Sequence, residues 1–295
     1  MNIIKYRKIY FSVSGVLILA SIIALAIFGI RPGIDFVGGT LWQIKGSADN
    51  EQLVIGDVKN FFEHELGIEN ITAYPTESGN FLFRFENISE EAHQEYLKKI
   101  KEKFGMMEEV SYETIGPAIG SELKVKAVSA ILFVLLGISL YVAYAFRKVS
   151  YPVKSYKYGI ITLITLFHDV VISIGLLSFL SWRYGFDFDI KYVVAILVIL
   201  GFSVHDTIVV FDRIRENLLV GHGKDLSAVI NASVNQTIAR SINTSLTLVL
   251  VLLALFLFGP ESLRYFVFVI MVGTIIGTYS SIFIASPLLL VAKGK

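Results

Sequence analysis

The chain has 295 residues, of which 54% are hydrophobic and 17% are charged, and its mean hydropathy is +0.66. Soluble domains carry about 25% charged residues, so this composition excludes an ordinary soluble protein. The net charge of +1 averages over segments of opposite charge and does not identify a partner, and the lack of cysteine excludes disulfides and thiolate metal sites.

Six apolar runs are long enough to cross a hydrocarbon core, which takes about 20 residues of helix. They lie near residues 9–30, 127–146, 158–180, 192–211, 238–258 and 266–290. The first run is too long for a signal peptide core, and "FGIRPGIDF" offers no small-residue cleavage site, so we expect a retained anchor. Basic residues gather on one side of the spans, which predicts that both termini are cytoplasmic.

The predicted fold is an α-helical integral membrane protein with six transmembrane helices and one extracytoplasmic domain. Its parts are a cytoplasmic tail with the first helix (1–30), the extracytoplasmic domain (31–124), and a five-helix transmembrane domain (125–295) that includes a cytoplasmic loop (213–237).

The extracytoplasmic domain carries 17 Asp and Glu against 9 Lys and Arg, which argues against nucleic acid or anionic lipid as its ligand. We interpret the acidic excess as a solvated surface. Strand patterns at 40–46, 69–75, 80–86 and 108–115 alternate with amphipathic helices at 50–67 and 89–105, the second with Ser89 as its N-cap. The order β-α-β-β-α-β predicts a small α+β ferredoxin-like domain, a fold that hosts many functions.

Two glycine-bearing stretches flank this domain, "GIDFVGGT" at 33–40 and "GPAIGSEL" at 116–123. The first follows a membrane helix and precedes a strand, so it is not a dinucleotide-binding fingerprint. We interpret both as turns where the chain leaves the bilayer and enters a sheet.

Two aspartates lie inside predicted spans, each preceded by a histidine: His168-Asp169 in the third span and His205-Asp206 in the fourth. A carboxylate at that depth costs about 2.5–3.5 kcal/mol on insertion scales, and such groups usually face the bundle interior on an ion or proton path. We therefore expect a proton relay through Asp206 and Asp169. The alternative is a structural hydrogen bond that locks the helices.

Each histidine is rotated by about 100° from the aspartate that follows it. We therefore expect each ring to donate to a backbone carbonyl, with His168, His205 and Thr207 as candidate modulators of the relay. Imidazole and carboxylate together also suit zinc or iron. No span offers histidines at i, i+4, however, and neither GxSxG nor HExxH occurs, so we expect neither a metal site nor a catalytic site.

Small polar residues recur at helical spacing in four spans and support an interior path. They are Thr162, Thr165, Asp169 and Ser173 in the third; Ser203, Asp206 and Thr207 in the fourth; Thr237, Arg240, Thr244 and Thr247 in the fifth; and Gly273, Thr274, Gly277, Thr278 and Ser281 in the sixth. The glycines of the sixth span would permit close helix contact. Arg240 is either a countercharge for Asp206 or a side chain that snorkels to the cytosol.

Several of these segments resemble the SecF family, the smaller of the paired SecD and SecF subunits that assist the bacterial Sec translocon. They are "GIDFVGGT" after the first span, "HDV" in the third, "DTIVVFDRIREN" ending the fourth and "TIARSINTS" before the fifth. The family-motif positions are Gly33, Asp35, Gly38, Gly39, Asp212, Arg213, Arg215 and Asn217. The resemblance covers the chain end to end, whereas a SecD subunit would carry a much larger extracytoplasmic domain.

The resemblance implies half of a resistance-nodulation-division-like fold that SecD completes, with proton flow driving motions that promote protein translocation. It maps the family's transmembrane aspartate onto Asp206 and its basic residue before the fifth span onto Arg240. The implied partners are a SecD-like subunit, the SecYEG translocon, small accessory membrane proteins and the emerging preprotein, with no nucleic acid. Protons are the coupling ion, no cofactor is expected, and the location is the bacterial cytoplasmic membrane. His205 replaces the Asn common in the family, which could change the pH response.

Two other functions fit the apolar spans. One is half of a resistance-nodulation-division-like, proton-coupled exporter of small solutes or lipids, which a large hydrophobic cleft in the extracytoplasmic domain would favour. The other is a membrane scaffold whose buried charges only lock helices, and such a scaffold should tolerate Asp206→Asn.

Overall fold

The computed structural model describes residues 2–45, 51–68, 70–75, 80–104, 108–147, 152–220 and 225–292. They divide into two compact units. The helical unit comprises Met1–Ile30, Val128–Phe186 and Lys191–Lys295, and the sheet unit comprises Arg31–Ala127 and Asp187–Ile190.

In the described part of the chain, six helical spans are long and apolar enough to cross a membrane, as the sequence predicts. They are formed by α1 (Arg7–Phe28) with the short η1 (Ile4–Tyr6) before it, α5 (Pro117–Ala145), α6 (Ser155–Tyr184), α7 (Ile190–Val220), α8 (Leu226–Phe258), and α9 (Arg264–Ser280) with the short η2 (Glu261–Leu263) before it. The last span continues through a π-helical segment, η3 (Ser281–Ala285), into α10 (Ser286–Val291). The protein is therefore a multi-pass membrane protein.

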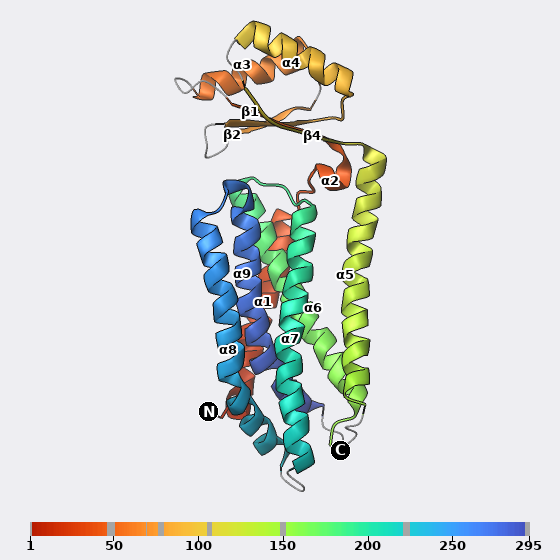
Figure 1. Ribbon diagram of the computed structural model, residues 1–295, viewed down its shortest axis with the longest axis vertical. Coiled ribbons are helices and arrows are strands. Elements are labelled where there is room, and N and C mark those ends of the chain that lie inside the picture. The colour runs from red at the N-terminus through yellow and green to blue at the C-terminus, as the bar shows by residue number, and fades with distance from the viewer. Residues whose placement is uncertain are drawn as a thin grey trace. The chain divides into compact units, whose positions relative to one another are not determined.

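The helices of the helical unit differ in how much of their apolar surface this chain covers. In the spans of α6, α7 and α9, more than half of the residues in the most apolar stretch are buried by the rest of the chain. In the spans of α1, α5 and α8, at most 17% of these residues are buried. Figure 1 shows these helices running side by side as a bundle. The three covered helices form its interior.

Small residues let the interior helices approach one another closely. A Cβ added to Gly277 of α9 would lie 2.8 Å from the Cβ of Ser203 on α7, and one added to Gly273 would lie 2.3 Å from Ile199. Both contacts are too short for any side chain larger than hydrogen. The predicted close contact of the sixth span is thus confirmed.

The sheet unit contains α2 (Ile34–Val37), β1 (Gly39–Lys45), α3 (Glu51–His64), β2 (Thr72–Pro75), β3 (Asn80–Phe85), α4 (Glu90–Phe104) and β4 (Glu108–Ile115). The sheet order is β2-β3-β1-β4, and each neighbouring pair is antiparallel. Figure 1 shows α3 and α4 on one face of the sheet. Apart from the added turn α2, the elements follow the order expected from the sequence.

The core of the sheet unit forms between that face and the two helices. Alternate side chains of β1 and β3 are buried, among them Trp42 and Phe83, and they pack with Phe62 of α3. Burying each such side chain contributes about 1.5–3 kcal/mol. The predicted N-cap of α4 is confirmed, because the hydroxyl of Ser89 accepts the N–H of Ala92 at 3.3 Å.

Candidate functional site

Asp206 of α7 lies buried in the interior of the helical unit, with 2% of its surface exposed. Its Oδ2 accepts hydrogen bonds from the hydroxyls of Thr278 on α9 at 3.0 Å and Ser245 on α8 at 3.4 Å. These two hydroxyls also contact each other at 2.5 Å. The carboxyl group thus joins three helices through hydroxyl groups, and among the described residues no ion pair involves it.

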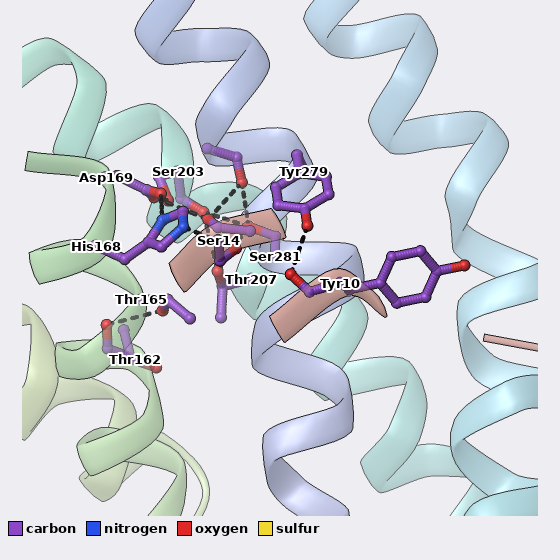
Figure 2. Close-up of polar contacts among 12 residues, drawn as sticks. Tyr10, Ser14, Thr162, Thr165, His168, Asp169, Ser203, Thr207, Tyr279 and Ser281 are labelled. Atoms are coloured by element: carbon purple, nitrogen blue, oxygen red, sulfur yellow. Dashed lines mark hydrogen bonds and ion pairs between the residues drawn. The ribbon is translucent and has the colours of Figure 1, made fainter. Parts of the chain in front are cut away.

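Asp169 of α6 forms a second buried site, and it is fully covered. Its Oδ2 accepts the hydroxyls of Ser203 on α7 at 2.5 Å and Ser280 on α9 at 2.9 Å. The Nδ1 of His168 lies 2.8 Å from its other oxygen, and the Nε2 lies 3.0 Å from the hydroxyl of Ser14 on α1 (Figure 2). Four helices therefore converge on one His–Asp pair.

The expectation that His168 would bond a backbone carbonyl is wrong. Although successive helical side chains diverge, the ring of His168 folds back onto the neighbouring carboxyl group of Asp169. A neutral ring can donate through Nδ1 to Asp169 and accept the Ser14 hydroxyl at Nε2, whereas a charged ring donates through both nitrogens. Each nitrogen of the ring therefore faces an oxygen with which it can share a hydrogen bond.

Hydroxyl groups of α7 and η3 contact each other next to residues that surround the two carboxyl groups. Thr207 contacts the hydroxyl of Ser281 at 2.8 Å, and Ser281 donates to the carbonyl of Ser203 at 3.1 Å (Figure 2). Ser203, which binds Asp169, lies one helical turn from Asp206 on α7. A shift of α7 therefore changes the surroundings of both carboxyl groups.

Ser281 also begins η3, where the helix widens to a π-helical turn. The hydroxyl of Ser286 donates to the carbonyl of Ser281 at 3.2 Å, and Pro287, which has no N–H to donate, follows. π-helical turns occur often at functional sites and at bends. The last span is thus locally irregular directly beside the residues that bind Asp169.

Two hydroxyls near the carboxyl groups have no hydrogen-bond partner in the described part of the chain. They belong to Ser173, one turn along α6 from Asp169, and to Ser241, one turn along α8 from Ser245. A buried hydroxyl without a partner costs about 1–3 kcal/mol. Both positions therefore carry spare hydrogen-bonding capacity next to the buried acids.

The predicted polar faces of the third, fourth and sixth spans are confirmed, because their members are buried. In the fifth span, however, Arg240 and Thr247 are exposed and Thr244 is only partly covered. Thr237 is buried as predicted, and together with Ser233, Ser241 and Ser245 it forms the buried row of hydroxyls on α8. Their unbroken i, i+4 spacing was a signal that the sequence reading missed.

Arg240 and His205 differ from the buried acids in their exposure to the surroundings of the chain. Both side chains are exposed, and the described contacts of Arg240 involve only its backbone carbonyl, which accepts the hydroxyl of Thr244 at 2.9 Å. The structure does not bring Arg240 to Asp206. His205 shows no carbonyl partner among the described contacts either, so the expectation for its ring is not met.

The motif residues at the C-terminal end of α7 connect that helix to the start of α8. The hydrogen bonds run from Arg213 to Gln236 at 2.6 Å and Glu216 at 2.5 Å, from Arg215 to Asp212 at 2.6 Å, and from Asn217 to Ser233 at 2.8 Å and Gln236 at 2.9 Å. The ion pairs are largely exposed and contribute little stability by themselves. The hydrogen bonds from Arg213 and Asn217 to Gln236 and Ser233 instead fix α7 against α8, the two helices that carry Asp206 and Ser245.

The glycine motif after the first span adopts the turn that the sequence predicts, whereas the prediction of a turn at 116–123 is wrong, because Pro117 begins α5 and proline suits the first position of a helix. Gly38 and Gly39 have φ of +77° and +126°, and a Cβ on Gly39 would lie 2.8 Å from the carbonyl oxygen of Phe85. Turn chemistry does not account for Asp35, whose Oδ2 accepts the N–H of Ile190 at 2.8 Å. This partner was not foreseen.

The described residues contain no cluster of three or more side chains that could hold a metal ion. The His–Asp pair at 168–169 is surrounded by serine hydroxyls, whereas zinc takes four ligands and prefers nitrogen and sulfur. The chemistry of the site is therefore that of titratable groups and hydroxyls.

Comparisons with known proteins identify the family of this chain. Residues 95–295 match the C-terminal family model of the protein export membrane proteins SecD/SecF, and residues 23–46 match the SecD/SecF GG motif. Protein translocase subunit SecF of Thermobaculum terrenum is 39% identical over 308 residues, which cover 100% of this chain and 95% of that protein. The SecF subunit of Anaerolinea thermophila is 34% identical, with 99% and 94% covered.

Two solved structures also match. The crystal structure of SecDF, a translocon-associated membrane protein from Thermus thermophilus, matches with a TM-score of 0.82 at 32% identity, over 99% of this chain. A crystal structure of SecDF in a super-membrane-facing form gives 0.68 at the same identity. This chain spans only 38% of either SecDF chain. On the family models and the full-length relatives, the chain belongs to the SecD/SecF family of protein export membrane proteins, within the group of SecF translocase subunits.

Proposed function

We propose that this chain acts with a SecD-like partner to couple proton movement to Sec-dependent protein translocation across the bacterial cytoplasmic membrane. The observation that carries the proposal is the pair of buried carboxyl groups, Asp206 and Asp169, whose partners in the described part of the chain are hydroxyls and an imidazole. Ionisable groups in such surroundings are expensive and typically mark proton paths.

Protonation changes the hydrogen-bonding role of Asp206. As a carboxylate it only accepts, and Thr278 and Ser245 donate to it. As an acid it carries a donor that needs an acceptor, and a nearby hydroxyl can turn to supply one. Because these hydroxyls belong to α8 and α9, proton uptake favours a different packing of α7 against both helices. This is how a proton can drive a conformational change.

The His168–Asp169 pair acts as the second station of the relay. Ser203 binds Asp169 and lies one turn from Asp206, so proton exchange at either acid acts on α7. The hydroxyls of Ser173 and Ser241, which have no partner among the described residues, are free to join such a relay. Thr207, which contacts Ser281, is the residue through which η3 follows α7.

The exposed faces of α1, α5 and α8 support a membrane partner as well as lipid contact. This chain matches 38% of the length of the SecDF chain. A separate SecD-like subunit would correspond to the remaining part of SecDF. Arg240 lies exposed on α8 and is proposed to act at that partner or at the membrane edge rather than on Asp206. The proposal also includes SecYEG and the emerging preprotein as partners, with both termini of this chain in the cytoplasm.

The sheet unit is proposed to be ferredoxin-like and extracytoplasmic. The order β1-α3-β2-β3-α4-β4, the sheet order β2-β3-β1-β4 and the antiparallel pairing support this class. A cavity of about 750 Å³ in this unit is lined by Arg84, Glu86, Asn87 and Thr72 among others. Apolar residues, among them Val37, Phe85 and Pro117, complete a mixed lining, so this cavity is not the large hydrophobic cleft that would favour the exporter.

The test is preprotein export in inverted vesicles that contain the chain, its SecD-like partner and the translocon. Wild type and Asp206→Asn are compared with and without an imposed proton gradient. The amide keeps the shape and the acceptor oxygen but cannot carry the proton, so the gradient should stimulate only wild type. Equal stimulation would leave the scaffold as the better account.

A further inference from the structure

Residues 187–190, which end the loop between α6 and α7, belong to the sheet unit by their contacts. The N–H of Phe188 donates to the carbonyl of Arg31 at 2.7 Å, and the N–H of Gly33 donates to the carbonyl of Phe188 at 2.7 Å. Pro32 and Phe188 form a parallel β-bridge between these bonds. The segment that precedes α7 is therefore paired, backbone to backbone, with the segment that precedes α2.

A charged pair reinforces this pairing. Nη1 of Arg84, on β3, lies 2.6 Å from the carboxylate of Asp187, and Nη2 donates to the carbonyl of Pro32 at 3.0 Å. The two side chains are only 23% and 19% exposed. One guanidinium thus holds both strands of the bridge, in a setting where a charge-assisted hydrogen bond is stronger than at a fully exposed surface.

Asp35 of the glycine motif provides the third contact. Its carboxylate accepts the N–H of Ile190, the first residue of α7, at 2.8 Å. That N–H is one of the donors left free at a helix N-terminus, and a negative charge there also favours the helix dipole. The rings of Phe36 and Phe188 stack beside it at 5.8 Å. Any side chain on Gly33 would press on Phe188, 3.1 Å from its added Cβ.

The helix that begins at this attachment is the one that carries Ser203 and Asp206. Asp206 lies sixteen residues beyond Ile190, which is about 24 Å along a helix that rises about 1.5 Å per residue. A shift of α7 along its axis must therefore carry residues 187–190 with it, and the β-bridge, Arg84 and Asp35 tie those residues to the sheet unit.

We propose that Asp35 and Arg84 are positioning residues that fasten the start of α7 to the sheet unit, so that a movement of α7 on proton exchange at Asp206 is delivered to β1 and β3. This inference rests on the proposed proton relay. It explains why the motif has an aspartate between its glycines, since a turn alone needs only the glycines. A purely structural role would fix the loop without transmitting anything from Asp206.

Hydrogen–deuterium exchange on the full chain with its SecD-like partner in lipid nanodiscs tests the attachment first. Asp35→Ala and Arg84→Met should raise the exchange rate of the amides of residues 188 and 190 about fivefold, the effect expected for losing a helix cap. The matched controls are Asp57→Ala and Lys98→Met, which remove like charges from exposed positions of α3 and α4 and should leave these amides unchanged.

Transmission is tested by adding Asp206→Asn. In an otherwise wild-type chain this substitution should change the exchange of β3, and in the Asp35→Ala, Arg84→Met background that change should be lost. If Asp206→Asn leaves β3 unaltered, or acts equally in both backgrounds, the proposal is overturned. Should the double variant misfold, the exchanged pair Arg84→Asp with Asp187→Arg replaces it; restored coupling relative to Arg84→Asp alone supports the proposal, and no restoration contradicts it.

Vesicle export separates the two proposals. If the gradient still stimulates export by Asp206→Asn, the proposed proton relay is refuted, whatever the hydrogen–deuterium exchange shows. If the relay passes this test but the hydrogen–deuterium exchange of β3 does not depend on residues 35 and 84, only the proposed attachment is refuted.

Discussion

Replacing Asp169 tests the packing role of the second acid separately from its proposed role in carrying protons. In Asp169→Ala the hydroxyl of Ser203 loses its described acceptor and His168 loses one of its two contacts, whereas Ser280 still donates to the carbonyl of Gly277 at 3.0 Å. Two buried groups left unsatisfied at about 1–3 kcal/mol each give a loss of about 2–6 kcal/mol. Asp169→Asn keeps one acceptor oxygen and should lose about 1 kcal/mol.

The assay is the free energy of unfolding of the purified chain in mixed micelles. Thr165→Ala is the control, because Thr165 is equally buried but its hydroxyl donates only to carbonyls of its own helix, those of Ile161 and Thr162. The control should cost clearly less than Asp169→Ala. If Asp169→Ala, Asp169→Asn and the control are indistinguishable, the hydrogen-bonded network does not hold the helices as described.

Three further predictions concern other positions. Arg240→Ala should reduce proton-stimulated export less than Asp206→Asn does, because its side chain is exposed on α8; an equal loss in the vesicle assay would return Arg240 to the relay. Gly277→Ala should cost about 1–3 kcal/mol of unfolding free energy, because the added Cβ would lie 2.8 Å from that of Ser203, and an unchanged value would show that α9 can move away. Burial raises the pKa of Asp187 although a guanidinium beside it opposes this. The infrared carboxyl band that Asp187→Asn removes should therefore titrate above the ordinary value of 3.8, and titration at or below that value would contradict the assigned burial.

The sequence was sufficient for the spans and for the order of elements in the sheet unit. Long apolar runs and the alternation in β1 and β3 are local patterns, and burial follows them directly. The buried acids were also predictable, because only an interior position tolerates Asp169 and Asp206 in such helices.

The face of α8 that points inward was not predicted. α8 carries two stripes of polar residues on an otherwise apolar surface. The prediction from the sequence placed the stripe that contains Arg240 in the interior. The structure buries the stripe of small hydroxyls because serine fits between closely packed helices and arginine does not. The composition of the two stripes alone does not show which of them faces the interior of the bundle.

Contacts between distant segments were beyond sequence reasoning. Asp35 and Ile190 are separated by 155 positions, and Arg84 and Asp187 by 103. No sequence pattern links residues that are so far apart in the chain. From the sequence alone, Asp35 could therefore be explained only as part of a turn. The bond from His168 to its own neighbour was missed for a different reason, because side-chain rotation can overcome the angular offset of a helix.

The most direct test of the account is the response of preprotein export to a proton gradient in inverted vesicles carrying wild type or Asp206→Asn, with insertion of both checked by protein levels. The account predicts that the gradient stimulates export by wild type and leaves export by Asp206→Asn at its gradient-free level. Equal stimulation of the two proteins would contradict it, and would make the buried carboxyl group a lock between helices.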